Sequence, residues 1–275
     1  RIDIGEGRNR LIVPASADDL AAIYAEHPGA TLVAGATDVG LWVTKFMRDI
    51  GPMVFIGGLA DLQGITSTAE GLTLGAGVSY NRARAAMVEM FPSLGELWSR
   101  IGGDQVRNAG TVGGNIANGS PIGDTPPPLI ALGATVSLRQ GDARRTVRLE
   151  DYFIAYGKQD RQPGEFVESV LVPRPKAESH VAVYKITKRR DEDISALCGA
   201  FHLETDGDHA EHRHGSGHQA YAPGQVTQAA DAAFDAKRAQ VGVVRQRFGH
   251  VGGGRCVGCG WGCGVSDCAG DGNRR

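Results

Sequence analysis

NAGTVGGNIANGSPIGD, residues 108–124, is the stretch around which this chain is organised. It consists mostly of Gly, Asn, Ser, Thr and Ala, and its five glycines allow the backbone to approach a ligand closely and turn N–H groups toward it. Glycines also cost conformational entropy on folding, which a plain surface turn does not require. We call residues 108–124 the second loop, because another glycine loop precedes it in the chain, and we predict that it binds a ligand. The alternative is a long surface loop.

A first loop, LVAGATDVG at Leu32–Gly40, has the same character. The pattern predicts a buried strand over residues 31–34 before its glycine and a helix over residues 39–47 after it. A glycine turn at a helix N-terminus favours anions, because free N–H groups and the helix dipole both attract negative charge. The loop matches neither the P-loop nor the G-x-G-x-x-G dinucleotide pattern. We predict that it binds a phosphate or pyrophosphate.

The remaining pattern predicts an α+β chain rather than a doubly wound sheet. Residues 11–34 have the pattern of one βαβ unit, with its helix capped by Ser16. Caps at Ser79, Ser93 and Asp124 predict the later helices. The expected later strands cover residues 53–56, 64–67, 72–75, 135–139, 146–149 and 165–172 and two strands within 180–203, and the expected later helices cover residues 80–90, 94–101 and 126–132.

Composition sets wide limits on the class of protein. The chain has 275 residues, enough for one large or two modest domains, and its 29 basic residues nearly balance its 31 acidic ones. It lacks the run of roughly 18 apolar residues that a membrane span needs. We expect a soluble cytoplasmic protein that binds no nucleic acid. Because the sequence starts at Arg1 without Met, we also expect a fragment or a processed chain.

The sequence changes character at His209. From there on it has no Leu, Ile or Met, but it holds four of the five cysteines and five of the eight histidines. So few large aliphatic residues cannot offset chain entropy. We expect residues 209–275 to be disordered or read out of frame, with no strand returning after the turn at Asp208. The alternative is a metal site at Cys256, Cys259, Cys263 and Cys268.

The residues available for chemistry favour binding over acid–base catalysis. No histidine lies between His27 and His180 to activate a serine, and Gly119-Ser120-Pro121 is not a nucleophile elbow. By itself, a lysine on a strand, such as Lys185, is most often a solvated charge. Two backbone cradles with Asp124 suit a nucleotide cofactor that supplies its own redox chemistry.

Three segments together resemble a known family: LVAGATDVG at residues 32–40, GGDQVRNAGTVGGNIANGSPIGDTPP at 102–127 and YKITKRRDEDIS at 184–195. They resemble the FAD-binding domain of the xanthine dehydrogenase and molybdenum hydroxylase family. Within it, the chain is most similar to the small subunit of two-subunit bacterial xanthine dehydrogenases, without the iron–sulfur part that would precede Arg1. Since Cys198 is the one cysteine before residue 209, no cluster is expected here.

The resemblance implies a vanillyl-alcohol-oxidase-type (PCMH) α+β fold. It implies an FAD-binding domain over residues 1–175, divided into subdomains at about residues 1–55 and 56–175. Residues 176–208 would begin a small C-terminal α+β subdomain, and Pro173-Arg174-Pro175 would mark the boundary.

The resemblance also implies a set of FAD contacts. The first loop would wrap the pyrophosphate, the second would complete the adenine and diphosphate side, and three further residues would lie near the flavin. The implied residues are Leu32, Val33, Ala34, Gly35, Ala36, Thr37, Asp38 and Val39; Gly110, Thr111, Gly114, Asn115 and Ile116; and Asp124, Tyr156 and Lys185. Ile101 stands where some relatives place an aromatic residue.

The function implied is an electron relay. A purine, hypoxanthine or xanthine, would be hydroxylated at a molybdopterin centre on a large partner subunit. The 2Fe–2S clusters would then pass electrons to this FAD, and NAD⁺ would accept them from it. The complex would be a heterotetramer. Alternatives are the FAD subunit of a hydroxylase for carbon monoxide, aldehydes or aromatic substrates, a self-contained flavin oxidase, and a non-catalytic nucleotide-binding module.

Overall fold

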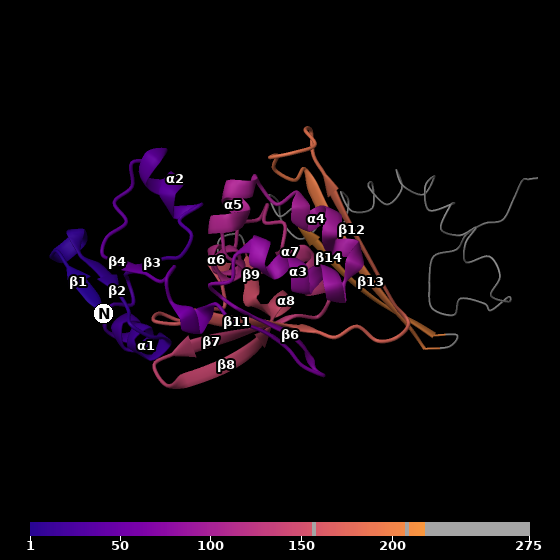
Figure 1. Cartoon of the computed structure of the whole chain (residues 1–275), viewed down its shortest axis with the longest axis horizontal. Helices are drawn as coiled ribbons and strands as arrows, with labels where there is room; N and C mark the ends of the chain where they lie inside the picture. Colours follow the sequence, from indigo (N-terminus) through magenta and orange to yellow (C-terminus); the bar gives the residue numbers. More distant parts are fainter. Residues whose placement is uncertain (156–157, 207–208, 218–275) are drawn as a thin grey trace, which may run out of the picture. The chain divides into compact units, whose positions relative to one another are not determined.

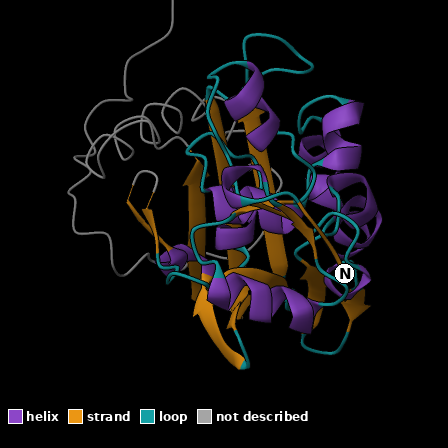
Figure 2. Ribbon diagram, turned by 90° about the vertical axis from the view of Figure 1, so that its left-hand side faces the viewer, coloured by secondary structure: helices purple, strands orange, loops and turns teal. Residues whose placement is uncertain are grey.

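The computed structural model describes residues 1–155, 158–206 and 209–217, with side chains up to residue 204 (Figure 1). All of these residues belong to one unit of the chain, Arg1–Phe234. It contains both helices and strands, as Figure 2 shows, so the described part is a mixed α+β structure. No helix in that part is long and apolar enough to cross a lipid bilayer.

A four-stranded sheet comes first, in the order β1-β2-β4-β3. Its strands are β1 (Ile2–Ile4), β2 (Leu11–Val13), β3 (Thr31–Val33) and β4 (Met53–Phe55). β2 and β3 both run parallel to β4, which lies between them in the sheet. The two strands of the predicted βαβ unit are therefore not direct neighbours. α1 (Ala17–Glu26) begins at Ser16, whose Oγ accepts from the amide of Asp19 at 3.1 Å, as predicted.

An antiparallel five-stranded sheet follows, in the order β5-β6-β11-β7-β8. Its strands are β5 (Ile65–Ser67), β6 (Gly71–Gly75), β7 (Thr135–Gln140), β8 (Ala143–Arg148) and β11 (Phe166–Pro173). α3 (Tyr80–Met90), α4 (Gly95–Ser99), α5 (Asp104–Ala109), α6 (Val112–Asn118), α7 (Pro126–Ala131) and α8 (Leu149–Tyr152) accompany it. β9 (Phe153–Ala155) and β10 (Lys158–Gln159) form a separate ribbon. Fully buried Trp98, Ile116 and Tyr152 belong to the core between this sheet and its helices.

A three-stranded antiparallel sheet ends the described chain. It contains β12 (Ser179–Ile186), β13 (Leu197–Asp206) and β14 (His209–Gly217), and α7 lies beside β13 and β14. The prediction that no strand returns after Asp208 is therefore wrong for residues 209–217. Ladder pairing uses backbone N–H and C=O groups, so a segment without large aliphatic residues can form it. Residues 218–275, including the four cysteines of the alternative metal site, lie outside the described residues.

Four predictions about the loops and helices need correction. The second loop is not a bare glycine loop, because α6 occupies its centre. Asp124 does not cap α7, since the side chain points to other partners. Ser93 makes no capping bond: it lies inside a short 3₁₀ turn, Pro92–Leu94, that precedes α4. α2 (Val39–Thr44) is also shorter than expected.

Candidate functional site

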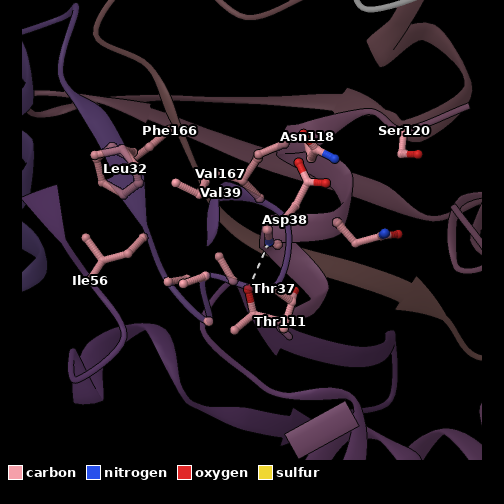
Figure 3. A pocket seen from close by; sticks show the side chains of 18 of the residues that line it. Leu32, Thr37, Asp38, Val39, Ile56, Thr111, Asn118, Ser120, Phe166 and Val167 are labelled. Carbon is pink, nitrogen blue, oxygen red and sulfur yellow. Dashed lines mark hydrogen bonds between the residues drawn. The ribbon is translucent and has the colours of Figure 1, made fainter. Parts of the chain in front are cut away.

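A cleft with a volume of about 710 Å³ lies between the first sheet and the helices over the second sheet. The side chains labelled in Figure 3 include Thr37 and Asp38 of the first loop and Thr111 and Asn118 of the second. Phe166 and Val167 of β11 also line it. A volume of this size is typical of small-molecule and cofactor sites.

The first loop presents unpaired backbone amides. Within the described part of the chain, no group accepts a hydrogen bond from the N–H groups of residues 35–39. Ala36 has the left-handed φ of +55°, which is uncommon for a residue with a Cβ. Successive amides around a left-handed residue form a concave nest that binds anions. Because α2 is only six residues long, these amides, rather than a helix dipole, are the groups available to an anion here.

The amides at the start of α6, in the second loop, are already occupied. Those of Val112 and Gly113 donate to the carbonyls of Val78 and Ala76, and the amide of Gly114 donates to Thr111 Oγ1 at 3.1 Å. Gly119, at φ +60°, ends α6 in the left-handed conformation. Gly113, Gly114 and Gly119 therefore belong to a capped helix, and this part of the second loop does not form a cradle like that of the first loop. An N-cap at Thr111 and a C-terminal Gly119 are sequence signals that could have revealed α6.

Asp124, at the end of the second loop, lines the cleft and also contacts the third sheet. Its Oδ2 accepts from Lys185 Nζ at 2.5 Å, and its Oδ1 accepts from Ser195 Oγ. The side chains of Asp124 and Lys185 are 10% and 3% exposed. Lys185 is thus a buried ion-pair partner rather than a solvated charge, which corrects the interpretation of it as a lone strand lysine.

Tyr80, from the start of α3, lies in the cleft and is buried. Burial, and then the negative charge of Asp124, hold the pKa of Tyr80 well above its usual range. The phenol therefore stays protonated at neutral pH and can donate a hydrogen bond.

The residues predicted for the site fall into three groups. Most of them line the cleft: Leu32, Ala34, Gly35, Ala36, Thr37, Asp38, Val39, Thr111, Gly114, Asn115 and Asp124. Four are not among the lining residues: Val33 and Ile116 are buried in the core, Gly110 lies under the Tyr80 ring, and Lys185 reaches the cleft only through Asp124. Tyr156 lies outside the described residues.

Sequence reasoning missed several lining residues, notably Tyr80, Arg161 and Phe166. Tyr80 and Phe166 begin a helix and a strand, where sequence pattern suggests only core positions. Arg161 follows β10 in a segment with no motif. Ile101, singled out for its relation to an aromatic position, does line the cleft.

Comparisons with known proteins identify the family of this chain. A family model described as "FAD binding domain in molybdopterin dehydrogenase" matches residues 7–175. Nicotinate hydroxylase of Emericella nidulans is 30% identical over 219 residues, 72% of this chain and 16% of that protein. Xanthine dehydrogenase of Drosophila subobscura is 31% identical over 207 residues, 69% of this chain and 15% of that protein. The chain thus spans about a sixth of the length of such relatives.

Solved structures share the fold. In the structure of carbon monoxide dehydrogenase from Hydrogenophaga pseudoflava, one chain superposes with a TM-score of 0.70 at 25% identity, covering 75% of this chain and 73% of that chain. The fold is therefore a mixed α+β FAD-binding fold. The family match covers more than half of the chain, so the chain belongs to the family of FAD-binding domains of molybdopterin dehydrogenases, the molybdenum hydroxylases.

Proposed function

We propose that this chain is the electron-transfer domain of a xanthine dehydrogenase, linking iron–sulfur clusters to NAD⁺ through FAD. A large partner subunit with a molybdopterin centre would hydroxylate hypoxanthine or xanthine, and a 2Fe–2S domain would lie between the two in a heterotetramer. FAD suits this position because it accepts electrons singly and releases them as a pair.

The observation that carries the proposal is the run of unpaired amides at residues 35–39 beside a cleft of about 710 Å³. Unpaired N–H groups are costly unless a ligand or water accepts from them. A diphosphate supplies several strong acceptors at once. The first loop therefore fits the pyrophosphate of FAD, and it would hold the cofactor by backbone groups.

Asp124 and Lys185 would lie at the flavin or its ribityl chain. The ammonium of Lys185 has three donors, and Asp124 takes one of them. Because Lys185 does not line the cleft, it would act on the flavin through Asp124. Because Asp124 and Lys185 compensate each other's charge, the pair adds hydrogen-bonding groups to the cleft without adding net charge.

The choice of purine rests on overall likeness to xanthine dehydrogenases. A second candidate is the FAD domain of another molybdenum hydroxylase, which the nicotinate hydroxylase at 30% identity and the carbon monoxide dehydrogenase fold favour. In either case this chain would bind FAD, the electron carrier, and the substrate would bind to another subunit.

Purification with a spectrum tests the proposal. We expect the purified chain to carry stoichiometric FAD with the visible absorption of a flavoprotein, and to co-purify with a molybdenum subunit when the two are co-expressed. NADH formation by that complex with hypoxanthine, nicotinate or carbon monoxide as the donor would separate the candidates. Well-folded chain that binds no FAD would refute both.

A further inference from the structure

Ser195 is buried beside the flavin end of the proposed site, although it does not line the cleft. It lies just before β13, is 1% exposed, and donates from Oγ to Asp124 Oδ1. Lys185 Nζ, from β12, donates to the other oxygen, Oδ2. We propose that Ser195 is a positioning residue, which fixes the Asp124 carboxylate and through it Lys185 against the flavin; this rests on the proposed function.

The geometry constrains Asp124 from both sides. A carboxylate held at one oxygen can rotate about its Cβ–Cγ bond, whereas one held at both oxygens has a fixed plane. The main chain is tied as well, because Cys198 Sγ donates to the Asp124 carbonyl at 3.8 Å. All three donors, Lys185, Ser195 and Cys198, come from β12, β13 and the turn that joins them. The third sheet thus determines how Asp124 is presented to the cleft.

The hydroxyl of Ser195 is not needed to close that turn. The amide of Ala196 donates to the carbonyl of Ile186 at 2.8 Å, and the β12–β13 ladder begins at the next pair, Ile186 with Leu197. Arg100 independently holds the same turn through the Lys185 and Arg190 carbonyls. Removing the hydroxyl should therefore leave the sheet formed while it frees Oδ1.

A matched control exists in the same sheet. Ser179 Oγ and His202 Nε2 are hydrogen-bonded at 2.7 Å at the other end of the β12–β13 pair. Ser179→Ala removes a comparable serine hydrogen bond without touching Asp124. A loss of sheet stability alone would affect both variants, whereas an effect on flavin would distinguish them.

The experiment compares the wild type, Ser195→Ala and Ser179→Ala of the whole chain. FAD affinity is measured by flavin fluorescence titration, and the midpoint potential of bound flavin by spectroelectrochemistry. We expect Ser195→Ala to weaken FAD binding roughly 5- to 30-fold, because a buried carboxylate oxygen loses its donor. We also expect a more negative potential, since the negative charge of Asp124 is less compensated near the flavin. Ser179→Ala should match the wild type in both.

The outcomes separate this inference from the proposed function. If the wild type binds FAD and Ser195→Ala keeps its affinity and potential, the positioning role is wrong while the proposed function stands. Failure of folded wild type to bind FAD overturns both. If Ser195→Ala does not fold, Ser195→Cys replaces it, because a thiol is close in size but a weak donor. A midpoint potential of Ser195→Cys more negative than that of the wild type then supports the role, and an unchanged potential overturns it.

Discussion

The two glycine loops meet at Gly35, where a Cβ atom would lie 1.7 Å from the carbonyl oxygen of Ala109. The space that glycine leaves is therefore filled by the backbone that leads into the second loop, and the missing side chain does not make room for the ligand directly. Gly35 sets the distance between the loops, and that distance sets the width of the cleft beside residues 35–39.

Gly35→Ala should consequently weaken FAD binding by about tenfold or more, because the methyl group must push the loops apart at the cost of an overpacked contact. Gly40→Ala is the control in the same loop, since nothing lies within 4 Å of a Cβ built there. Flavin fluorescence titration measures both. Equal FAD affinity in the two variants would contradict a spacing role for Gly35.

At the same scale, residue type alone could not separate cleft residues from their neighbours. Ile116 and Asn115 are adjacent in α6, yet Asn115 lines the cleft and Ile116 is fully buried in the core. Lys185 has an ordinary strand context, and its burial depends on Asp124, 61 positions away. The loops were predictable from composition, but the direction of each side chain depends on helix phase and on distant partners.

Among the elements, α1 and β7 are joined by a buried arginine. The side chain of Arg139 is 3% exposed, and it contacts Asp18 of α1 at 2.5 Å and Glu168 of β11 at 3.2 Å. This network connects the first sheet's helix to the second sheet. Asp18 is itself 85% exposed, so solvent screens its share of the interaction.

We expect Arg139→Gln to lower the free energy of unfolding by roughly 2 kcal/mol, because the Gly141 carbonyl and Glu168 lose a buried donor, although Glu168 keeps its contact with Arg144. Asp18→Asn should cost about 1 kcal/mol or less, as exposed ion pairs do. Urea unfolding of the two variants measures the difference. Equal losses would mean that the contact to Asp18, rather than burial of the arginine, carries the stability.

Local signals predicted most of these elements and missed others for identifiable reasons. Ser16 and Ser79 cap α1 and α3 as expected, and the turn at Gly141 joins β7 to β8. α6 was missed because its two internal glycines weaken a helical pattern. β14 was missed because backbone pairing leaves no hydrophobic signature. The division into subdomains near residues 55 and 175 stays a prediction.

For the molecule as a whole, buried acids make stability fall in alkaline solution. Burial raises the pKa of Cys198 and of Tyr152, each to about 12. In the unfolded chain a thiol and a phenol ionise at about 8.5 and 10. Above those values the unfolded chain binds fewer protons than the folded one, so the free energy of unfolding decreases as pH rises.

Each such group should contribute a decrease of about 1.4 kcal/mol per pH unit between its unfolded and folded pKa. We expect Cys198→Ala to remove the contribution of Cys198 to this decrease in the free energy of unfolding, which starts near pH 9. Urea unfolding from about pH 8 to about pH 11 would compare that variant with the wild type. Identical slopes in the two proteins would show that the thiol of Cys198 ionises as freely in the folded chain as in the unfolded one.

The third sheet determines how far the whole chain can be shortened from its C-terminal end before FAD binding weakens. The cleft is lined by residues between Tyr24 and Val167, and the contacts behind Asp124 end at Cys198. Residues 1–217 include every described residue that lines the cleft or contacts Asp124, so they should bind FAD within about twofold of the full chain. Ending the chain at residue 206 removes β14, leaves β13 an edge strand and takes away the strand beside α7. That shorter chain should unfold at lower urea and bind FAD more weakly, because β13 carries Cys198 and follows Ser195. Equal affinity and stability in the two truncated chains would mean that β14 does not support the site.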